Sequence, residues 1–147
     1  MSGFSSCVRQ VLAEKAIAPK SVIKLFSPDT KPPKLKRFII IGISENSFGS
    51  VIINTEINEK VYPLGSYFNS LQIALNHFES CKYLDHNSFV DCTYIYKWDK
   101  PEVINLLSIK NSDILGMLLE SHWTLIKDAI ISCRSISPKI KKEFGLI

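Results

Sequence analysis

The feature that most constrains the fold is a continuous apolar run in the first third of the chain, Phe38-Ile-Ile-Ile-Gly-Ile-Ser44. A strand with one solvent-facing side alternates apolar and polar residues, whereas a run without alternation is typical of a strand buried on both faces. The run is far shorter than the roughly 18 apolar residues that indicate a transmembrane helix. The sequence therefore predicts a central strand of a sheet that is buried on both faces.

Four further segments are predicted as strands. They are short, contain β-branched or aromatic residues and are bounded by turn residues. They cover residues 21–26, 50–57, 71–75 and 88–96. Between the central strand and its partner, Glu45 to Gly49 is predicted as a hairpin turn in which Gly49 supplies a positive φ. Consecutive antiparallel strands with short turns favour a small barrel or a curled sheet.

Helices are predicted at both ends of the chain. Residues 6–18 contain good helix formers with apolar residues at roughly helical spacing, and Pro19 follows them. Asp99 is predicted to cap a helix with Pro101 in its first turn. Residues 114–133 form the strongest amphipathic stretch and are predicted as one long helix.

The order of these elements predicts the α+β class, mainly β, with C-terminal helices and a short N-terminal helix. Because helices do not alternate with strands, a doubly wound α/β fold is disfavoured. One domain is expected over residues 1–147, a common size for a single domain. Its predicted parts are an N-terminal helical extension (1–20), a barrel core (21–96) and C-terminal helices (99–147).

The net charge of +4 is unevenly distributed along the chain. Residues 1–37 contain eight basic and two acidic residues, and the remainder carries a slight negative balance. Such a basic segment can attract phosphate groups, or it can be a solvated loop whose lysines serve solubility. The N-terminus lacks the pattern of a secretory signal, so a cytoplasmic protein without membrane association is expected.

The four cysteines are expected to be reduced thiols. Cys92 and Cys133 lie in apolar segments and are predicted to be small core residues. His77, Cys81, His86 and Cys92 fall within sixteen residues, which suggests zinc. Their spacing, H-x3-C-x4-H-x5-C, matches no common zinc-binding pattern. No metal and no other cofactor is therefore expected.

Three segments carry a family resemblance. The first is a basic residue that opens a buried strand, Lys36-Arg37-Phe-Ile-Ile-Ile-Gly-Ile-Ser44. The second is its partner strand with a polar end, Val51-Ile-Ile-Asn-Thr-Glu-Ile57, and the third is Tyr83-Leu-Asp-His-Asn-Ser-Phe-Val-Asp-Cys92 before a helix. In this order, over roughly residues 20–133, they resemble the PemK/MazF-like toxins of toxin–antitoxin modules. The resemblance implies an SH3-like antiparallel barrel of about five strands, a homodimer, metal-free cleavage of single-stranded RNA and a neutralising antitoxin protein.

The resemblance also implies roles for particular residues. Arg37 matches the family's arginine that opens the long strand, and Thr55 matches a hydroxyl-bearing residue at the end of the partner strand. Asp85 and Ser88 fall where the family has polar residues before a later strand. Phe38 departs from the pattern, because the family's arginine is usually followed by proline.

Metal-free RNA cleavage needs a base, an acid and a cation that stabilises the phosphorane. Arg37 is predicted to be the stabilising cation and His86 the acid or base, because their chemistry suits these tasks. Thr55 or Asn54 is predicted to orient the phosphate, with Thr55 as the third catalytic residue. The predicted RNA-binding residues are Lys31, Lys34, Lys36, Asn54, Asp85 and Ser88.

Each of these residues also has a structural interpretation. Arg37 can extend along a strand edge, Thr55 can be a plain β-former and His86 an ordinary loop residue. Tyr94 and Tyr96 can stack on bases or pack across strands. A second class of function stays open as well, a non-catalytic barrel that binds nucleic acid or a protein partner.

Overall fold

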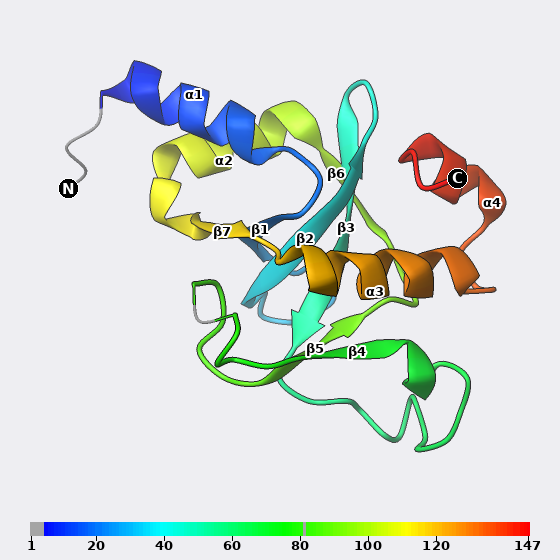
Figure 1. Cartoon of the computed structure of the whole chain (residues 1–147). Helices are drawn as coiled ribbons and strands as arrows, with labels where there is room; N and C mark the ends of the chain where they lie inside the picture. Colours follow the sequence, from blue (N-terminus) through cyan, green and yellow to red (C-terminus); the bar gives the residue numbers. More distant parts are fainter. Residues whose placement is uncertain (1–4, 81) are drawn as a thin grey trace.

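The computed structural model describes residues 5–80 and 82–147. Within these residues, seven strands form one antiparallel sheet that curls into a half-barrel, and four α-helices cover its two faces (Figure 1). The strands are β1 (Ser21–Phe26), β2 (Leu35–Ile43), β3 (Ser47–Asn54), β4 (Gln72–Leu75), β5 (Ser88–Asp91), β6 (Tyr96–Asp99) and β7 (Ile114–Met117). The helices are α1 (Ser6–Ala16), α2 (Lys100–Ile109), α3 (Glu120–Ser132) and α4 (Pro138–Glu143). The predicted α+β class is confirmed.

The strand order is β4-β5-β3-β2-β1-β7, and β6 pairs with the first half of β3. β2 lies between β1 and β3, with Arg37 opposite Lys24 on one side and Ile53 on the other. This order confirms that the continuous apolar run is the central strand.

The apolar run is buried on both faces because it contributes to two separate cores. Phe38 and Ile40 point to one face, where they pack with residues of α1 and α2. Ile39 and Ile41 point to the other face, where α3 and the segment after α4 lie. Figure 1 shows α1 beside α2 on one side of the sheet and α3 crossing the other side. The sheet is therefore the middle layer of three.

The prediction of one strand over residues 88–96 is wrong, because a turn divides this segment into β5 and β6. The Asp91 carboxylate accepts hydrogen bonds from the backbone N–H (3.0 Å) and the hydroxyl group (2.6 Å) of Thr93. Gln72 and Tyr62 also donate to this carboxylate, at 3.0 and 3.2 Å. The anchored turn lets β5 and β6 pair with different halves of β3.

The prediction of one helix over residues 114–133 is also wrong at its start. Residues 114–117 form β7, which pairs with the outer edge of β1, with Ser21 opposite Met117. Gly116 has a φ of 150°, which favours glycine. α3 begins only at Glu120. The free backbone groups at this edge of β1 form hydrogen bonds with residues 114–117. The helical spacing of apolar residues in the sequence does not reveal this long-range pairing.

Gly49 does not form a turn with positive φ, contrary to the sequence-based prediction. It lies inside β3 opposite Gly42 on β2. A Cβ atom on Gly42 would stand 2.0 Å from the carbonyl oxygen of Phe144, and one on Gly49 would stand 2.9 Å from the Phe144 ring. The two glycines therefore make room for the segment that follows α4 to approach the sheet.

In the part of the chain that the structure describes, no helix has the length and apolar character needed to cross a membrane.

Candidate functional site

The predicted site residues gather around a cavity of about 230 Å³ at one end of the sheet. This end is formed by the start of β2, the end of β3 and the loop that precedes β5. The cavity is lined by Leu35, Lys36, Arg37, Ile53, Asn54, Thr55, Leu84, Asp85, His86 and Ser88. Seven of the nine residues predicted from the sequence thus lie around one cavity, although they come from three separate segments.

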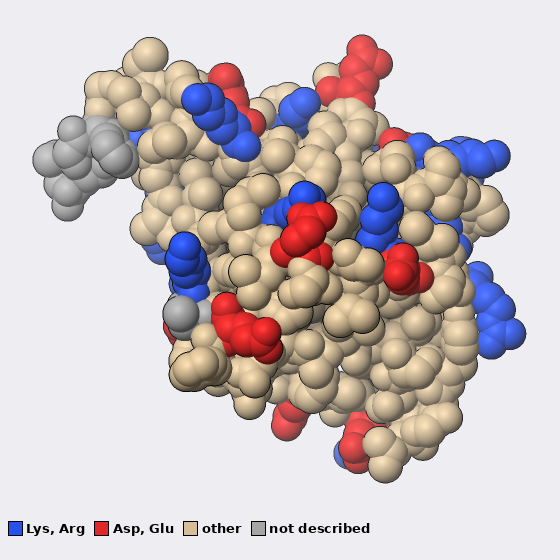
Figure 2. Space-filling view, in the orientation of Figure 1, with Lys and Arg blue, Asp and Glu red and all other residues tan. Residues whose placement is uncertain are grey.

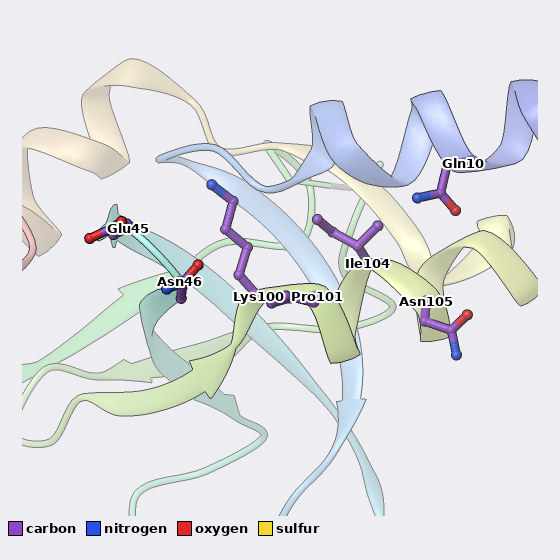
Figure 3. Close-up of a pocket in the computed structure, with 7 residues that line it drawn as sticks. All are labelled: Gln10, Glu45, Asn46, Lys100, Pro101, Ile104 and Asn105. Carbon is purple, nitrogen blue, oxygen red and sulfur yellow. The ribbon is translucent and has the colours of Figure 1, made fainter.

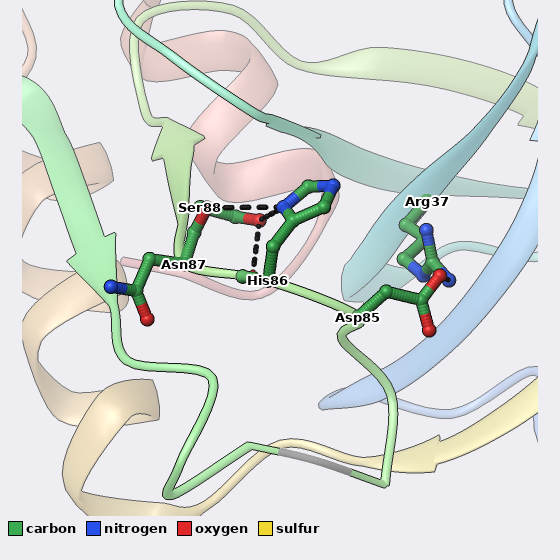
Figure 4. A network of polar contacts seen from close by, with 5 residues as sticks. All are labelled: Arg37, Asp85, His86, Asn87 and Ser88. Atoms are coloured by element: carbon green, nitrogen blue, oxygen red, sulfur yellow. Dashed lines mark hydrogen bonds and ion pairs between the residues drawn. The ribbon is translucent and has the colours of Figure 1, made fainter.

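Arg37 and Asp85 form an ion pair at this cavity (Figure 4). The Nη2 atom of Arg37 donates to Oδ2 of Asp85 at 2.8 Å. The Arg37 side chain is 22% exposed and that of Asp85 is 77% exposed. The hydrogen bond from Arg37 and its positive charge hold the pKa of Asp85 below the ordinary value of 3.8. Asp85 is therefore a carboxylate at neutral pH and occupies the guanidinium group of Arg37.

Arg37 keeps a further donor that Asp85 does not use. Its Nε atom is buried and has no hydrogen-bond partner among residues 5–80 and 82–147. Buried donors are usually paired, so this group marks a place where the packing is incomplete.

His86 follows Asp85 in the loop, and Figure 4 shows its ring beside the Arg37–Asp85 pair, with its hydrogen bonds drawn toward Asn87 and Ser88. Its Nδ1 atom lies 3.1 Å from the carbonyl oxygen of Asn87 and 3.3 Å from Oγ of Ser88. The Ser88 hydroxyl group donates to the His86 carbonyl oxygen at 3.0 Å. A carbonyl oxygen can only accept, so Nδ1 carries the proton of the neutral ring. Nε2 then has a free lone pair and can act as a base.

The loop that carries Asp85 and His86 is held in place from both sides. Tyr83 and Leu84 are buried in the core under α3, so the two residues that follow must emerge at the surface. On the other side, Oδ1 of Asn87 accepts the backbone N–H of His77 at 2.9 Å. The buried anchors explain how an exposed loop presents two polar side chains in defined positions.

Asn54 and Thr55 reach the cavity from the end of β3. Asn54 is the last residue of the strand and is opposite Phe89 on β5. Thr55 lies just beyond the strand and is exposed, so the prediction that β3 extends to residue 57 is wrong. The last rung of the β3–β5 ladder joins Asn54 to Phe89. Thr55 is therefore free of the ladder and available to a ligand.

Lys31 and Lys34 do not line the cavity. They lie in the exposed connection between β1 and β2, which is closed by a hydrogen bond from the Ser27 backbone N–H to the Lys34 carbonyl oxygen at 2.9 Å. Lys36 does line the cavity. Of the predicted RNA-binding lysines, one thus stands at the site and two stand on the adjoining loop.

Lys24 does not line the cavity, but it contributes to the electrostatics of the site and sequence reasoning did not identify it. It lies opposite Arg37 in the ladder of β1 and β2, and its charge also lowers the pKa of Asp85. Its position depends on the strand register, which the sequence alone does not show. The sequence contains one weak indication of this role: Lys24 is a single charged residue between the buried apolar residues of β1.

The residues considered for zinc are not brought together. Cys92 is fully buried in the core together with Cys133, as predicted, and burial raises the pKa of the Cys92 thiol. Cys81 lies outside the described residues. Within the described ranges, no three His, Cys, Asp or Glu side chains are grouped so that they could hold a metal ion.

Another hollow, of about 300 Å³, lies between α1, the turn after β2 and the start of α2 (Figure 3). Its lining is Gln10, Glu45, Asn46, Lys100, Pro101, Ile104 and Asn105. None of these is a predicted site residue, and most are neutral. This hollow offers fewer reactive groups than the cavity at Arg37.

Charged residues of both signs are interspersed on the face of the molecule that carries α3 (Figure 2). The positive balance of the first 37 residues therefore does not produce a broad basic surface on this face. Local cations such as Lys36 and Arg37, which stand directly at the cavity, matter more for the site than the net charge.

The chain matches no protein-family model and no curated protein. Its function must therefore be argued from the residues of the site.

Proposed function

We propose that this chain binds single-stranded RNA at the cavity and cleaves it without a metal ion. The observation that carries the proposal is the meeting of Arg37, Thr55, Asp85 and His86 around one cavity. Its volume of about 230 Å³ corresponds to roughly eight liquid-water molecules at about 30 Å³ each. This volume suits a phosphodiester group with part of its ribose.

The proposed reaction begins with a proton transfer to His86. Its Nε2 atom accepts the proton of the ribose 2′-hydroxyl group, and the 2′ oxygen forms a bond to phosphorus. The bond from phosphorus to the 5′ oxygen breaks, which leaves a 2′,3′-cyclic phosphate on one fragment. The 5′ oxygen takes its proton from solvent water, because the lowered pKa of Asp85 makes this carboxyl group a poor acid at neutral pH.

Arg37 supplies the positive charge that the phosphorane requires. It must exchange the Asp85 carboxylate for the phosphate, and the high exposure of Asp85 allows this side chain to move into solvent. Thr55 and Lys36 line the same cavity and can bind the remaining phosphate oxygens.

An RNA cleavage assay in EDTA tests this proposal. Wild-type protein is expected to release fragments with 2′,3′-cyclic phosphate ends, and Arg37→Ala or His86→Ala should lower the rate by about 100-fold or more. His77→Ala is the matched control, because His77 lies in the same loop but does not line the cavity. Intact RNA with the wild type, or equal rates for all variants, would refute cleavage.

A second candidate function is RNA binding without cleavage. It is favoured by the Arg37–Asp85 pair, in which the catalytic cation already has an anionic partner. This function predicts an affinity for RNA that falls steeply with salt while the RNA remains intact. The family resemblance adds a homodimer and a neutralising antitoxin to either proposal, and both stay predictions.

A further inference from the structure

Phe26 at the end of β1 lies on the same face of the sheet as Arg37. Val22 is opposite Ile39 in the ladder of β1 and β2, and both belong to the core on the face that carries α3. Side chains on one face of a strand recur at every second residue. Lys24 and Phe26 of β1 and Arg37 of β2 therefore all point to this face.

The strand register also brings Phe26 close to Arg37. Lys24 is opposite Arg37 and Phe26 is opposite Leu35, so Phe26 is the diagonal neighbour of Arg37. Diagonal neighbours in an antiparallel ladder are about 7–8 Å apart, which is within reach of long and aromatic side chains. The Phe26 ring is 63% exposed, so it can be contacted by a ligand.

An apolar cavity of about 180 Å³ lies between the end of β1 and the C-terminal half of α2. Four of the apolar side chains that line it are also exposed to solvent, namely Phe26, Leu35, Leu106 and Ile109. Exposed apolar side chains that gather at a hollow are typical of a binding site. The volume corresponds to roughly six liquid-water molecules at about 30 Å³ each, which is room for one nucleobase.

The apolar cavity adjoins the cavity at Arg37. Leu35 lines both of them. Lys24 lines the apolar cavity, and its positive charge reaches Asp85 at the other cavity and lowers the pKa of that carboxyl group. Two cations thus stand next to an exposed aromatic ring. The cations favour an anionic group and the ring favours a planar apolar one, and a nucleotide joins both groups in one molecule.

We propose that the apolar cavity holds the base of the nucleotide whose phosphate binds Arg37, with Phe26 as the stacking surface. This inference rests on the proposed function, because it assumes a nucleic acid at Arg37, but it does not depend on cleavage. The strand must be single, since the bases of a duplex are stacked on one another and have no free face for Phe26.

Binding of an uncleavable oligonucleotide tests the base site. The probe is a fluorescein-labelled 2′-O-methyl oligouridine of about 12 nucleotides, titrated by fluorescence anisotropy at low salt. Phe26→Ala is expected to weaken binding about tenfold, and Phe26→Tyr, which keeps the ring, should bind within roughly twofold of wild type. Phe78→Ala is the matched control, since Phe78 is 89% exposed and lines neither cavity.

An abasic version of the probe separates stacking from charge. Without bases, wild type and Phe26→Ala should bind equally. The base site is refuted if Phe26→Ala binds the uridine probe like wild type, or if it loses affinity for both probes to the same extent. Either result would favour an acidic, apolar segment of a protein partner as the occupant of the apolar cavity.

The base site and the catalytic proposal can fail separately. Cleavage that is slowed by Arg37→Ala but unaffected by Phe26→Ala would overturn the base site alone. Loss of affinity in Phe26→Ala, without cleavage by the wild type, would support the base site and overturn the catalytic proposal.

Discussion

At the scale of single residues, the interaction that decides what the site can bind is the pair of Arg37 and Asp85. The carboxylate takes the place that a phosphate oxygen would occupy on the guanidinium group. A ligand must therefore displace Asp85 before it can use the full binding capacity of Arg37. Displacement is feasible because the Asp85 side chain is exposed and can move into solvent. It is necessary because the negative charge of Asp85 would repel a phosphate bound at Arg37.

Replacing Asp85 by asparagine should strengthen RNA binding. Asp85→Asn keeps the shape of the side chain but removes the charge that competes with phosphate, so we expect affinity to rise about two- to fivefold. Fluorescence anisotropy titration of a labelled 2′-O-methyl oligouridine, which cannot be cleaved because its 2′-hydroxyl groups are methylated, measures the change at low salt. Asp128→Asn, on exposed α3 surface away from the cavity lining, controls for net charge. Unchanged or weaker binding would contradict the competition.

The titration of Asp85 should depend on Arg37. Because the pKa of Asp85 is lowered in the folded protein, the pair contributes to stability above the ordinary pKa of 3.8 and is lost as pH falls through the lowered value. NMR titration of the carboxyl carbon is expected to give a pKa below 3.8 in the wild type. In Arg37→Gln the pKa should return toward 3.8. An identical pKa in both proteins would show that the ion pair does not form in solution.

At the scale of elements, Lys141 shows how a helix end is completed by a residue from another element. Lys141 is one of three lysines near the C-terminus, and its position on α4 leaves it only 8% exposed. Its ammonium group donates to the carbonyl oxygens of Ile131 (2.6 Å) and Cys133 (2.9 Å) at the end of α3. A cation at this position also interacts favourably with the helix dipole.

Lys141→Met should lower the free energy of unfolding by about 1–3 kcal/mol, because two carbonyl groups lose their donor while the aliphatic packing is kept. Urea unfolding followed by circular dichroism measures this change. Lys142→Met, one residue later and exposed, should have an effect within about 0.5 kcal/mol. Equal effects of the two substitutions would argue against the capping role.

The glycine pair of β2 and β3 sets the distance between the sheet and the segment after α4. Gly42→Ala would place a Cβ atom against the rigid backbone of Phe144, so we expect a loss of about 1–3 kcal/mol. Gly49→Ala meets the Phe144 ring and the Ile95 side chain, which can shift, and should cost less. Thermal or urea unfolding ranks the two variants. The opposite order would mean that the C-terminal segment does not pack as closely as described.

At the scale of the whole molecule, the sheet separates two hydrophobic cores. Leu107 of α2 belongs to one core and Ile126 of α3 to the other, and both are fully buried. Leu107→Ala and Ile126→Ala should each cost about 2–5 kcal/mol. Because the residues share no core, the double variant should cost the sum within about 0.5 kcal/mol. Urea unfolding of the three variants measures the coupling, and an interaction above roughly 1 kcal/mol would show that the cores are linked.

Much of the local structure could be predicted from the sequence. β1 was predicted at its exact bounds, and Asp99 caps α2 with Pro101 in the first turn, as expected. These predictions depend on local properties, namely β-branched content, capping side chains and the fixed φ of proline. The family resemblance and the chemistry of metal-free RNA cleavage point to the seven residues around the cavity, and their roles in catalysis and binding stay predictions.

The local sequence was enough to establish the class of the fold and its central strand, because an apolar run without alternation has to be buried on both sides. The tertiary structure alone decided which segments became partners. Residues 114–117 are a strand because β1 offers them a free edge, and Gly42 and Gly49 serve close packing because Phe144 approaches them. Likewise, Asp85 meets Arg37 across 48 residues of chain. Such contacts depend on strand register and packing, which join residues that no local pattern connects.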